Sequence, residues 1–177
     1  MIKFLFVGRL DTQKNPIMLL RVAHKIIEQY PDTTFTIVGD GEEYKKCVQY
    51  VENNNLENNI RLEGWKNDVS PFYKDCDIFV MTSIYEAFGL IFLEAGYNRL
   101  PTIATNVEGI PEVVLHGKTG LLSDSNDIDA MTQNAIFLIE HPDTRLMMGN
   151  NAYEYVTQNF SSETMVKRYR DLYEKSI

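Results

Sequence analysis

Residues 77–95 read DIFVMTSIYEAFGLIFLEA, and this stretch decides the fold. Its first five residues form a short apolar run rich in β-branched and aromatic side chains, which is typical of a buried strand. The segment then continues into Leu90, Leu93 and Tyr97, which recur at helical spacing. The stretch is therefore predicted to form a strand, a tight loop and a helix.

The start of this helix is predicted to bind an anion. A helix N-terminus presents unpaired backbone N–H groups and the positive end of the helix dipole. Gly89 has no side chain, so another group can approach the backbone closely at this point. We expect the amides of Phe88, Gly89 and Leu90 to form a phosphate seat.

Two carboxylates, Glu86 and Glu94, flank this seat. At 1.5 Å per residue, eight residues would separate them by about 12 Å in a continuous helix, and by less if the loop folds back. The paired carboxylates of a glycoside hydrolase lie closer, about 5 to 9.5 Å apart. The spacing instead fits one extended ligand with phosphates in its middle and a hydroxyl-bearing group at each end, which is the layout of a nucleotide-sugar.

The two glutamates and the FGL sequence at 88–90 resemble the E-x7-E signature of the retaining glycosyltransferases called glycosyl transferases group 1. That family has the two-domain GT-B architecture. The similarity runs from FVGRL at 6–10 to TGLL at 119–122, and it concerns only the C-terminal, donor-binding domain. Two departures are minor: Asn15 stands where a glycine is common, and NRLP at 98–101 replaces a run of small residues.

The remaining site residues follow from chemistry and from this resemblance. Arg9 can grip a diphosphate with two hydrogen bonds, and Lys14 can add a point charge as a sugar departs and leaves negative charge on the phosphate. The resemblance implies that Glu86 holds hydroxyls of the transferred sugar and that Glu94 holds the ribose hydroxyls. The predicted catalytic residues are Arg9, Lys14 and Glu86, and the predicted donor-binding residues are Gly8, Trp65, Lys66, Phe88, Gly89, Leu90 and Glu94.

Each assignment has a plainer alternative. Arg9 and Lys14 could be solvated loop cations, and the two glutamates could be a cap residue and a surface carboxylate. The GDG sequence at 39–41 is expected to be mainly a tight turn. Trp65 is expected to pack rather than to stack on a base, although its main chain would border the base. The Tyr and Phe positions at helical spacing are expected to lie in the core.

Composition restricts the class of protein. The chain has 177 residues, 44% of them hydrophobic, which suits a single globular domain. Its net charge of −8 gives no basic field for nucleic acid or anionic lipid, so an anionic ligand must be held by local cations and backbone amides. Nucleic acid is therefore not an expected partner.

Cysteine and metal chemistry are not expected. Cys47 and Cys76 lie 29 residues apart without a CxxC pair, and the three histidines are too few for a zinc pattern. We predict two reduced thiols, no metal and no cofactor. The sequence shows neither a signal peptide nor 18 consecutive apolar residues, so a cytosolic location is expected.

The chain alternates between strand and helix signals. Predicted strands lie at 3–7, 35–38, 60–62, 77–81, 102–104 and 120–122, and predicted helices end the chain at 128–140, 143–158 and 163–174. Asn15 is predicted to cap the first helix, with Pro16 as its first residue. This alternation predicts a Rossmann-like, doubly wound parallel sheet of six strands with helices on both faces, one half of a GT-B fold.

With the common strand order 3-2-1-4-5-6, strands 1 and 4 are neighbours where the order reverses, and ligands bind outside their carboxyl ends. The loops that follow these two strands carry Arg9 with Lys14 and Glu86 with Gly89. We therefore expect these loops to meet at one crevice, although they are about 75 residues apart in sequence.

Residues 1–177 are thus predicted to be a single nucleotide-sugar (donor) binding domain, with the N-terminal acceptor domain of a GT-B enzyme absent. The chain would be an excised domain, a truncated gene product or half of a two-chain enzyme. The resemblance implies a UDP-, GDP- or ADP-sugar donor and a glycan or lipid-linked acceptor in cell-surface polysaccharide biosynthesis. Acceptor binding and peripheral membrane association at the inner face would depend on the absent domain. The alternatives are a non-catalytic nucleotide-sugar binding module or partner subunit, and a related sugar epimerase.

Overall fold

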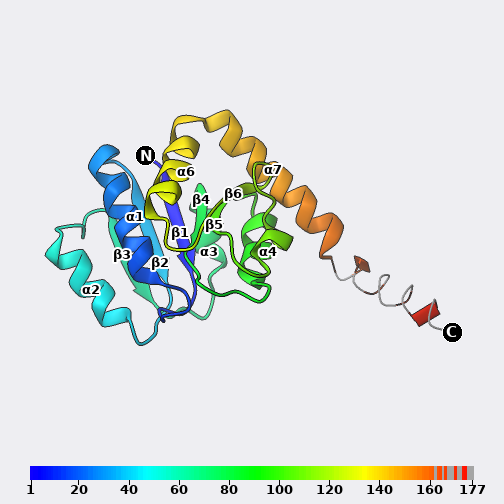
Figure 1. The fold of residues 1–177 in the computed structure, drawn as a ribbon, viewed down its shortest axis with the longest axis horizontal. Coiled ribbons are helices and arrows are strands. Elements are labelled where there is room, and N and C mark those ends of the chain that lie inside the picture. The colour runs from blue at the N-terminus through cyan, green and yellow to red at the C-terminus, as the bar shows by residue number, and fades with distance from the viewer. Residues whose placement is uncertain (162, 165, 167–169, 171–172, 175–177) are drawn as a thin grey trace.

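The computed structural model describes residues 1–161, 163, 164, 166, 170, 173 and 174. Six parallel strands form one sheet in the order β3-β2-β1-β4-β5-β6. The predicted strand order and the predicted fold class are both confirmed (Figure 1). The strands are β1 Lys3–Val7, β2 Thr34–Val38, β3 Ile60–Gly64, β4 Ile78–Met81, β5 Thr102–Thr105 and β6 Gly120–Ser123.

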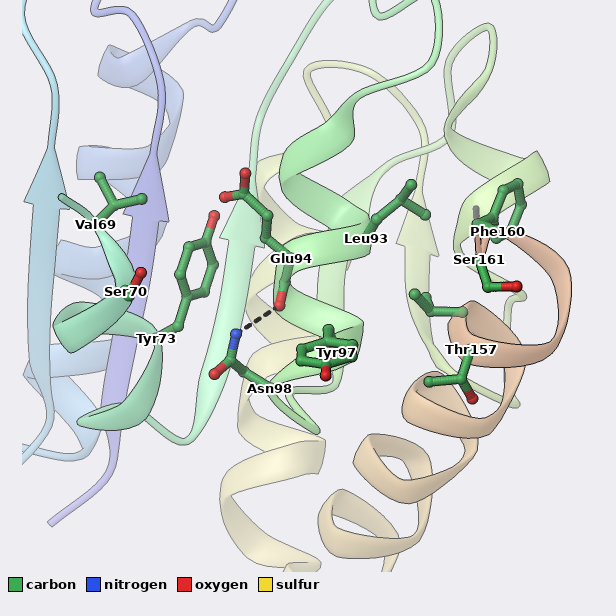
Figure 2. A pocket seen from close by; sticks show the side chains of 11 residues that line it. Val69, Ser70, Tyr73, Leu93, Glu94, Tyr97, Asn98, Thr157, Phe160 and Ser161 are labelled. Atoms are coloured by element: carbon green, nitrogen blue, oxygen red, sulfur yellow. Dashed lines mark hydrogen bonds between the residues drawn. The ribbon is translucent and has the colours of Figure 1, made fainter. Parts of the chain in front are cut away.

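Helices cover both faces of this sheet. Figure 2 shows α3 and α4 in front of the strands and α1 and α6 behind them. The helices are α1 Pro16–Gln29, α2 Tyr44–Asn53, α3 Ser70–Lys74, α4 Leu90–Tyr97, α5 Ile110–Val113, α6 Ile128–Glu140 and α7 Pro142–Asn159. The helix predicted at 163–174 lies partly outside the described residues. The short helix α5 is a single helical turn.

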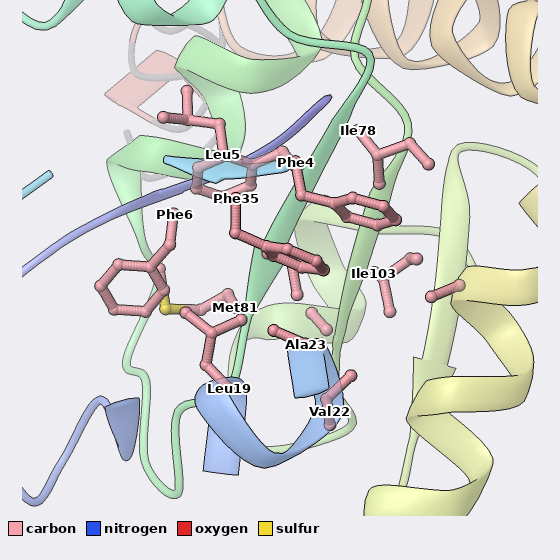
Figure 3. Close-up of a cluster of buried hydrophobic side chains, with 14 of the residues drawn as sticks. Phe4, Leu5, Phe6, Leu19, Val22, Ala23, Phe35, Ile78, Met81 and Ile103 are labelled. Atoms are coloured by element: carbon pink, nitrogen blue, oxygen red, sulfur yellow. The ribbon is translucent and has the colours of Figure 1, made fainter. Parts of the chain in front are cut away.

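The core lies on both faces of the sheet, and Figure 3 shows the part of it that includes α1. The strands β1 and β4 read as nearly unbroken apolar runs because both faces of a parallel sheet are covered. Phe4 and Phe35 stack across β1 and β2 with their ring centroids 4.6 Å apart. Leu19 and Ala23 of α1 are fully buried in the same core. This packing fixes the carboxyl ends of the central strands, from which the loops of the site emerge.

Asn15 caps α1 and Pro16 is its first residue, as predicted. Its side-chain oxygen accepts a hydrogen bond from the Met18 amide at 3.3 Å, and its backbone is left-handed with φ 48°. Asparagine adopts this conformation more readily than most residues, and glycine does so at no steric cost. Asn15 therefore fills a position that suits glycine and adds a helix cap.

Tyr97 of α4 does not lie in the core, contrary to the expectation for Tyr and Phe positions at helical spacing. Leu90 and Tyr97 are exposed, whereas Phe92, Ala95 and Gly96 are buried. The helix is apolar on nearly all sides, so the spacing of its apolar residues does not select one face. Its small residues decide instead, because they let α7 pack closely against α4.

Candidate functional site

The loop and helix after β4 have the backbone arrangement on which the predicted anion seat depends. Gly89 precedes α4 with φ 75°, a left-handed conformation that favours glycine. A Cβ at this position would lie 2.5 Å from the Phe92 ring. Gly89 is therefore required for both its conformation and its close packing, and α4 begins at Leu90 as predicted.

The loops after β1 and β4 meet, as their strand positions predict. The Ile84 amide donates to the Gln13 carbonyl at 2.9 Å, and the Gln13 side-chain amide donates to the Tyr85 carbonyl at 3.0 Å. The Thr82 hydroxyl donates to the carbonyls of Lys14 and Asn15 at 2.9 and 3.0 Å. These contacts join segments 67 to 72 residues apart in sequence.

Lys14 and Glu86 form an ion pair at this junction. Their side chains are only 12% and 11% exposed, so both charges are largely withdrawn from water. The backbone holds the pair from both sides, since the Lys14 amide donates to Asp11 at 3.0 Å and the Gly109 amide donates to the Glu86 carbonyl at 3.0 Å. The structure thus brings together two predicted catalytic side chains, one from each loop.

Arg9 lies at the outer side of the same loop. Its side chain is 73% exposed, and its Nη2 atom is 3.1 Å from Asp11 Oδ2 and 3.4 Å from Gln13 Oε1. Asp11 therefore contacts Arg9 through its side chain and the Lys14 backbone at once. The arginine is held near the rim of the sheet while it stays accessible to an anionic ligand.

A small hollow of about 240 Å³ opens at the carboxyl ends of β1, β2 and β3. Gly8, Arg9, Gly39, Trp65 and Lys66 are among the residues that line it. The expectation that Trp65 packs into the protein is wrong, because its side chain is 70% exposed. The hollow brings three predicted donor-binding residues next to Arg9.

The GDG sequence at 39–41 is a tight connection, and the reason is steric. A Cβ on Gly39 would lie 1.8 Å from the Gly8 carbonyl oxygen, and one on Gly41 would lie 2.4 Å from the Leu10 carbonyl oxygen. The loops after β1 and β2 therefore touch through their backbones. Asp40 joins the lining of the small hollow.

A larger groove of about 510 Å³ runs between α3, α4 and the end of α7 (Figure 2). Glu94 lines it, and its backbone carbonyl accepts a hydrogen bond from the Asn98 side chain at 2.8 Å. Val69 lines both this groove and the small hollow, so the two adjoin. Arg9 and Glu94 thus line neighbouring hollows, as one ligand that contacts both requires.

Sequence reasoning missed Tyr73 as a site residue. It lies on α3 and is only 2% exposed, which agrees with the general expectation that such aromatic residues lie in the core. Figure 2 shows its hydroxyl end directed toward the Glu94 carboxylate. Burial first, and then the charge of Glu94, raise the pKa of the Tyr73 phenol. The sequence signals only that an aromatic residue precedes β4.

Both cysteines are free thiols, as predicted. Burial raises the pKa of Cys47 to about 11 and that of Cys76 to about 12. Among the residues that the structure describes, no group of three or more His, Cys, Asp or Glu side chains is arranged to hold a metal ion. In the described part of the chain, no helix is long and apolar enough to cross a membrane.

Comparisons with known proteins show the family and the fold of the chain. The family model described as "Glycosyl transferases group 1" matches residues 2–155. An Escherichia coli UDP-Gal:alpha-D-GlcNAc-diphosphoundecaprenol alpha-1,3-galactosyltransferase is 35% identical over 173 residues, which are 96% of this chain and 44% of the relative. An N-acetyl-alpha-D-glucosaminyl L-malate synthase of Bacillus anthracis is 35% identical over 142 residues, 80% of this chain and 37% of the relative. The chain thus spans less than half the length of these relatives.

Among solved structures, TarM of S. aureus superposes with a TM-score of 0.90 at 24% identity, over 96% of this chain and 35% of TarM. The C-terminal domain of a glycosyl transferase group 1 family protein from Francisella tularensis has a TM-score of 0.79 at 24% identity. That match covers 90% of this chain and 86% of the Francisella domain. The shared fold therefore corresponds to about a third of TarM and to most of the Francisella domain.

Proposed function

The chain belongs to the glycosyl transferases group 1 family, and we propose that it is the donor-binding domain of a retaining glycosyltransferase that uses a nucleotide-sugar. The observation that carries this proposal is the meeting of Lys14 and Glu86 in front of the α4 N-terminus. One edge of the sheet thus carries the cations, the carboxylate and the backbone amides that binding of a nucleotide-sugar requires.

The proposed donor lies along this edge. Its diphosphate contacts Arg9, Lys14 and the amides of residues 88–90, where cations and a helix N-terminus stabilise the negative charge left as the sugar departs. Glu86 takes hydroxyls of the transferred sugar. Lys14 and Glu86 already contact each other, so a donor that reaches both would lie against the pair, with its phosphate toward Lys14 and its sugar toward Glu86.

The nucleoside end occupies the two adjoining hollows. Glu94 takes the ribose hydroxyls from the larger groove, and the smaller hollow, lined by Gly8, Trp65 and Lys66, borders the base. The exposed ring of Trp65 can cover one face of a base, which a core tryptophan could not do. Val69, which lines both hollows, lies where the base and the ribose are joined.

A UDP-sugar is the first donor to test. The name of the Escherichia coli relative includes UDP-Gal, and structures of Anabaena HepE and of TarM are in complex with UDP. GDP- and ADP-sugars are the alternatives. Relatives named for alpha-D-GlcNAc-diphosphoundecaprenol and for poly(ribitol-phosphate) support a cell-surface glycan or glycolipid acceptor, and hence transfer at the cytoplasmic face of the membrane.

We expect residues 1–177 to bind the donor but to transfer sugar negligibly, because a GT-B enzyme holds its acceptor with a second domain. Robust transfer by residues 1–177 alone would contradict this division of roles. If a protein that also carries an acceptor domain binds the donor without transferring sugar, the non-catalytic binding module becomes the better assignment.

Isothermal titration calorimetry with UDP-, GDP- and ADP-sugars tests the proposal. Arg9→Ala should weaken binding of the preferred donor by about tenfold or more, because hydrogen bonds to charged groups contribute about 1.5–3 kcal/mol each. Lys25→Ala is the matched control, since it removes the same charge from an exposed ion pair with Asp129. Equal affinities for all three proteins, or no binding of any donor, would contradict the proposed function.

A further inference from the structure

Tyr73 carries a buried hydroxyl that the fold does not require. Its ring packs against Phe79, with the centroids 5.8 Å apart, and the whole residue is 2% exposed. Among the described residues, this hydroxyl lacks a hydrogen-bond partner within normal distance. Buried polar groups in folded proteins are nearly always paired, so an unpaired one needs an explanation. A phenylalanine would fill the same space without that cost.

The hydroxyl is directed at a site residue. Figure 2 shows Tyr73 on α3 facing Glu94 on α4 across the groove, with the phenol end of the ring beside the glutamate side chain. After burial, Glu94 is the largest influence that raises the pKa of this phenol. The Tyr73 hydroxyl is therefore protonated at neutral pH and can donate a hydrogen bond toward the carboxylate.

The two residues differ in access to the groove. The Tyr73 hydroxyl is shielded from solvent, whereas Glu94 is exposed on the groove wall. A ligand in the groove would therefore contact the carboxylate and not the phenol. The backbone of Glu94 is held by Asn98, whose amide and side chain both donate to the Glu94 carbonyl. What remains to be oriented is the carboxylate itself.

We propose that Tyr73 is a positioning residue for the ribose of the donor. When the donor is bound, its hydroxyl donates a hydrogen bond to one oxygen of the Glu94 carboxylate, which leaves the other oxygen directed into the groove to accept from the ribose diol. This inference rests on the proposed function, because it assumes that Glu94 binds ribose. It adds a residue from α3 that the E-x7-E pattern does not contain.

The test compares Tyr73→Phe with the wild type by calorimetry, using whichever of UDP, GDP and ADP the wild type binds most tightly and the 2′,3′-dideoxy form of that nucleotide. Tyr73→Phe should weaken binding of the ribonucleotide by about threefold to tenfold, the effect of one hydrogen bond. It should leave binding of the dideoxy form unchanged. Tyr50→Phe on α2, away from the groove, is the matched control and should change neither affinity.

A second comparison separates positioning from a merely structural role. In a Glu94→Gln background, Tyr73→Phe should have little further effect, because the hydroxyl acts only through the carboxylate. Equal weakening of both nucleotide forms would show a general structural defect and overturn the inference, as would unchanged ribonucleotide affinity. If the wild type binds none of the nucleotides, the proposed function itself fails.

Thermal unfolding shows whether the variant is intact. Tyr73→Phe removes a hydroxyl without a described partner, so its melting temperature should equal or exceed that of the wild type. A clear loss of stability would show that the hydroxyl supports the core instead, and this result would also overturn the inference.

Discussion

The pair Lys14 and Glu86 links the stability of the protein to its proposed activity. Each side chain is almost withdrawn from solvent and has the other as its ion-pair partner. Removing one member of a buried pair leaves an uncompensated charge, which costs more than the pair itself contributes. The catalytic role that we propose for both residues therefore carries a structural constraint, and single substitutions will affect folding as well as binding.

Lys14→Met should lower the free energy of unfolding by about 3 kcal/mol, because it leaves the Glu86 carboxylate buried without its cation. The double variant Lys14→Met with Glu86→Gln should recover most of this loss, since no buried charge remains. Urea unfolding of the wild type, both single variants and the double variant measures the coupling. Additive losses in the double variant would contradict this account.

The two thiols should be unreactive in the native protein. Burial raises the pKa of Cys47 to about 11 and of Cys76 to about 12, so the reactive thiolate is scarce near neutral pH. We expect a thiol-specific disulfide reagent to label neither residue at pH 8 until the protein is unfolded, when both react. Rapid labelling of either cysteine in the folded protein would contradict this prediction.

The same thiols destabilise the fold in alkali. A thiol whose folded pKa exceeds its unfolded value favours folding fully at pH below the unfolded pKa, near 9, and this contribution is lost as the pH rises. Stability should therefore fall between about pH 9 and pH 12. Cys47→Ser with Cys76→Ser should flatten that part of the profile, measured by urea unfolding at each pH.

Short elements show how far the sequence alone determines the structure. The first strand was predicted at its observed bounds because a buried parallel strand is an unbroken apolar run, and here a glycine, Gly8, ends that run. The buried face of α4 was not predictable in the same way. Leu90, Leu93 and Tyr97 have helical spacing, but only the packing of α7 shows which side of an apolar helix is covered.

In the candidate site, too, features set by strand order could be predicted, whereas features set by the packing of helices could not. The meeting of the loops that carry Arg9, Lys14 and Glu86 could be predicted, because strand order positions these loops and the alternation of elements indicates that order. Tyr73 could not be predicted, because its relation to Glu94 depends on how α3 and α4 pack side by side. The expectation that Trp65 packs into the protein was wrong, because the apolar character of a loop residue does not show whether the neighbouring elements leave space to bury it.

Close contacts of α7 with the rest of the domain should make two glycines hard to replace. A Cβ on Gly96 would lie 2.7 Å from a methyl group of Val156, whereas one on Gly149 would lie 2.1 Å from the Arg99 carbonyl oxygen. Gly96→Ala should cost about 1–3 kcal/mol in unfolding free energy, as other overpacked cores do. Gly149→Ala should cost more, because a backbone cannot turn aside as a side chain can.

A compensating change distinguishes overpacking from other effects. Val156→Ala removes the methyl group nearest to Gly96, so it should cancel part of the loss caused by Gly96→Ala but none of the loss caused by Gly149→Ala. Gln133→Ala, an exposed substitution on α6, should stay within about 0.5 kcal/mol of the wild type. Chemical denaturation of these variants measures all of the differences.

The proposed donor carries the same sign of charge as the whole domain. Its net charge of −8 opposes the approach of a nucleotide-sugar, so affinity must come from Arg9, Lys14 and the amides at α4. The strand order makes this possible, because it places the loops after β1 and β4 next to each other where the sheet reverses its order. The fold thus concentrates a few positive groups at one edge of an acidic molecule.

Ligand binding should therefore be visible as a rise in melting temperature of the whole domain. A nucleoside diphosphate at about 100 times its dissociation constant stabilises the folded state by about 2.7 kcal/mol, which corresponds to roughly 5–10 °C for a domain of this size. Differential scanning fluorimetry measures the shift. Arg9→Ala should abolish most of it at the same ligand concentration, whereas Lys25→Ala should retain it, since Lys25 pairs with Asp129 outside the site. Shifts of equal size in both variants would mean that the anion binds away from the rim formed by β1 and β4.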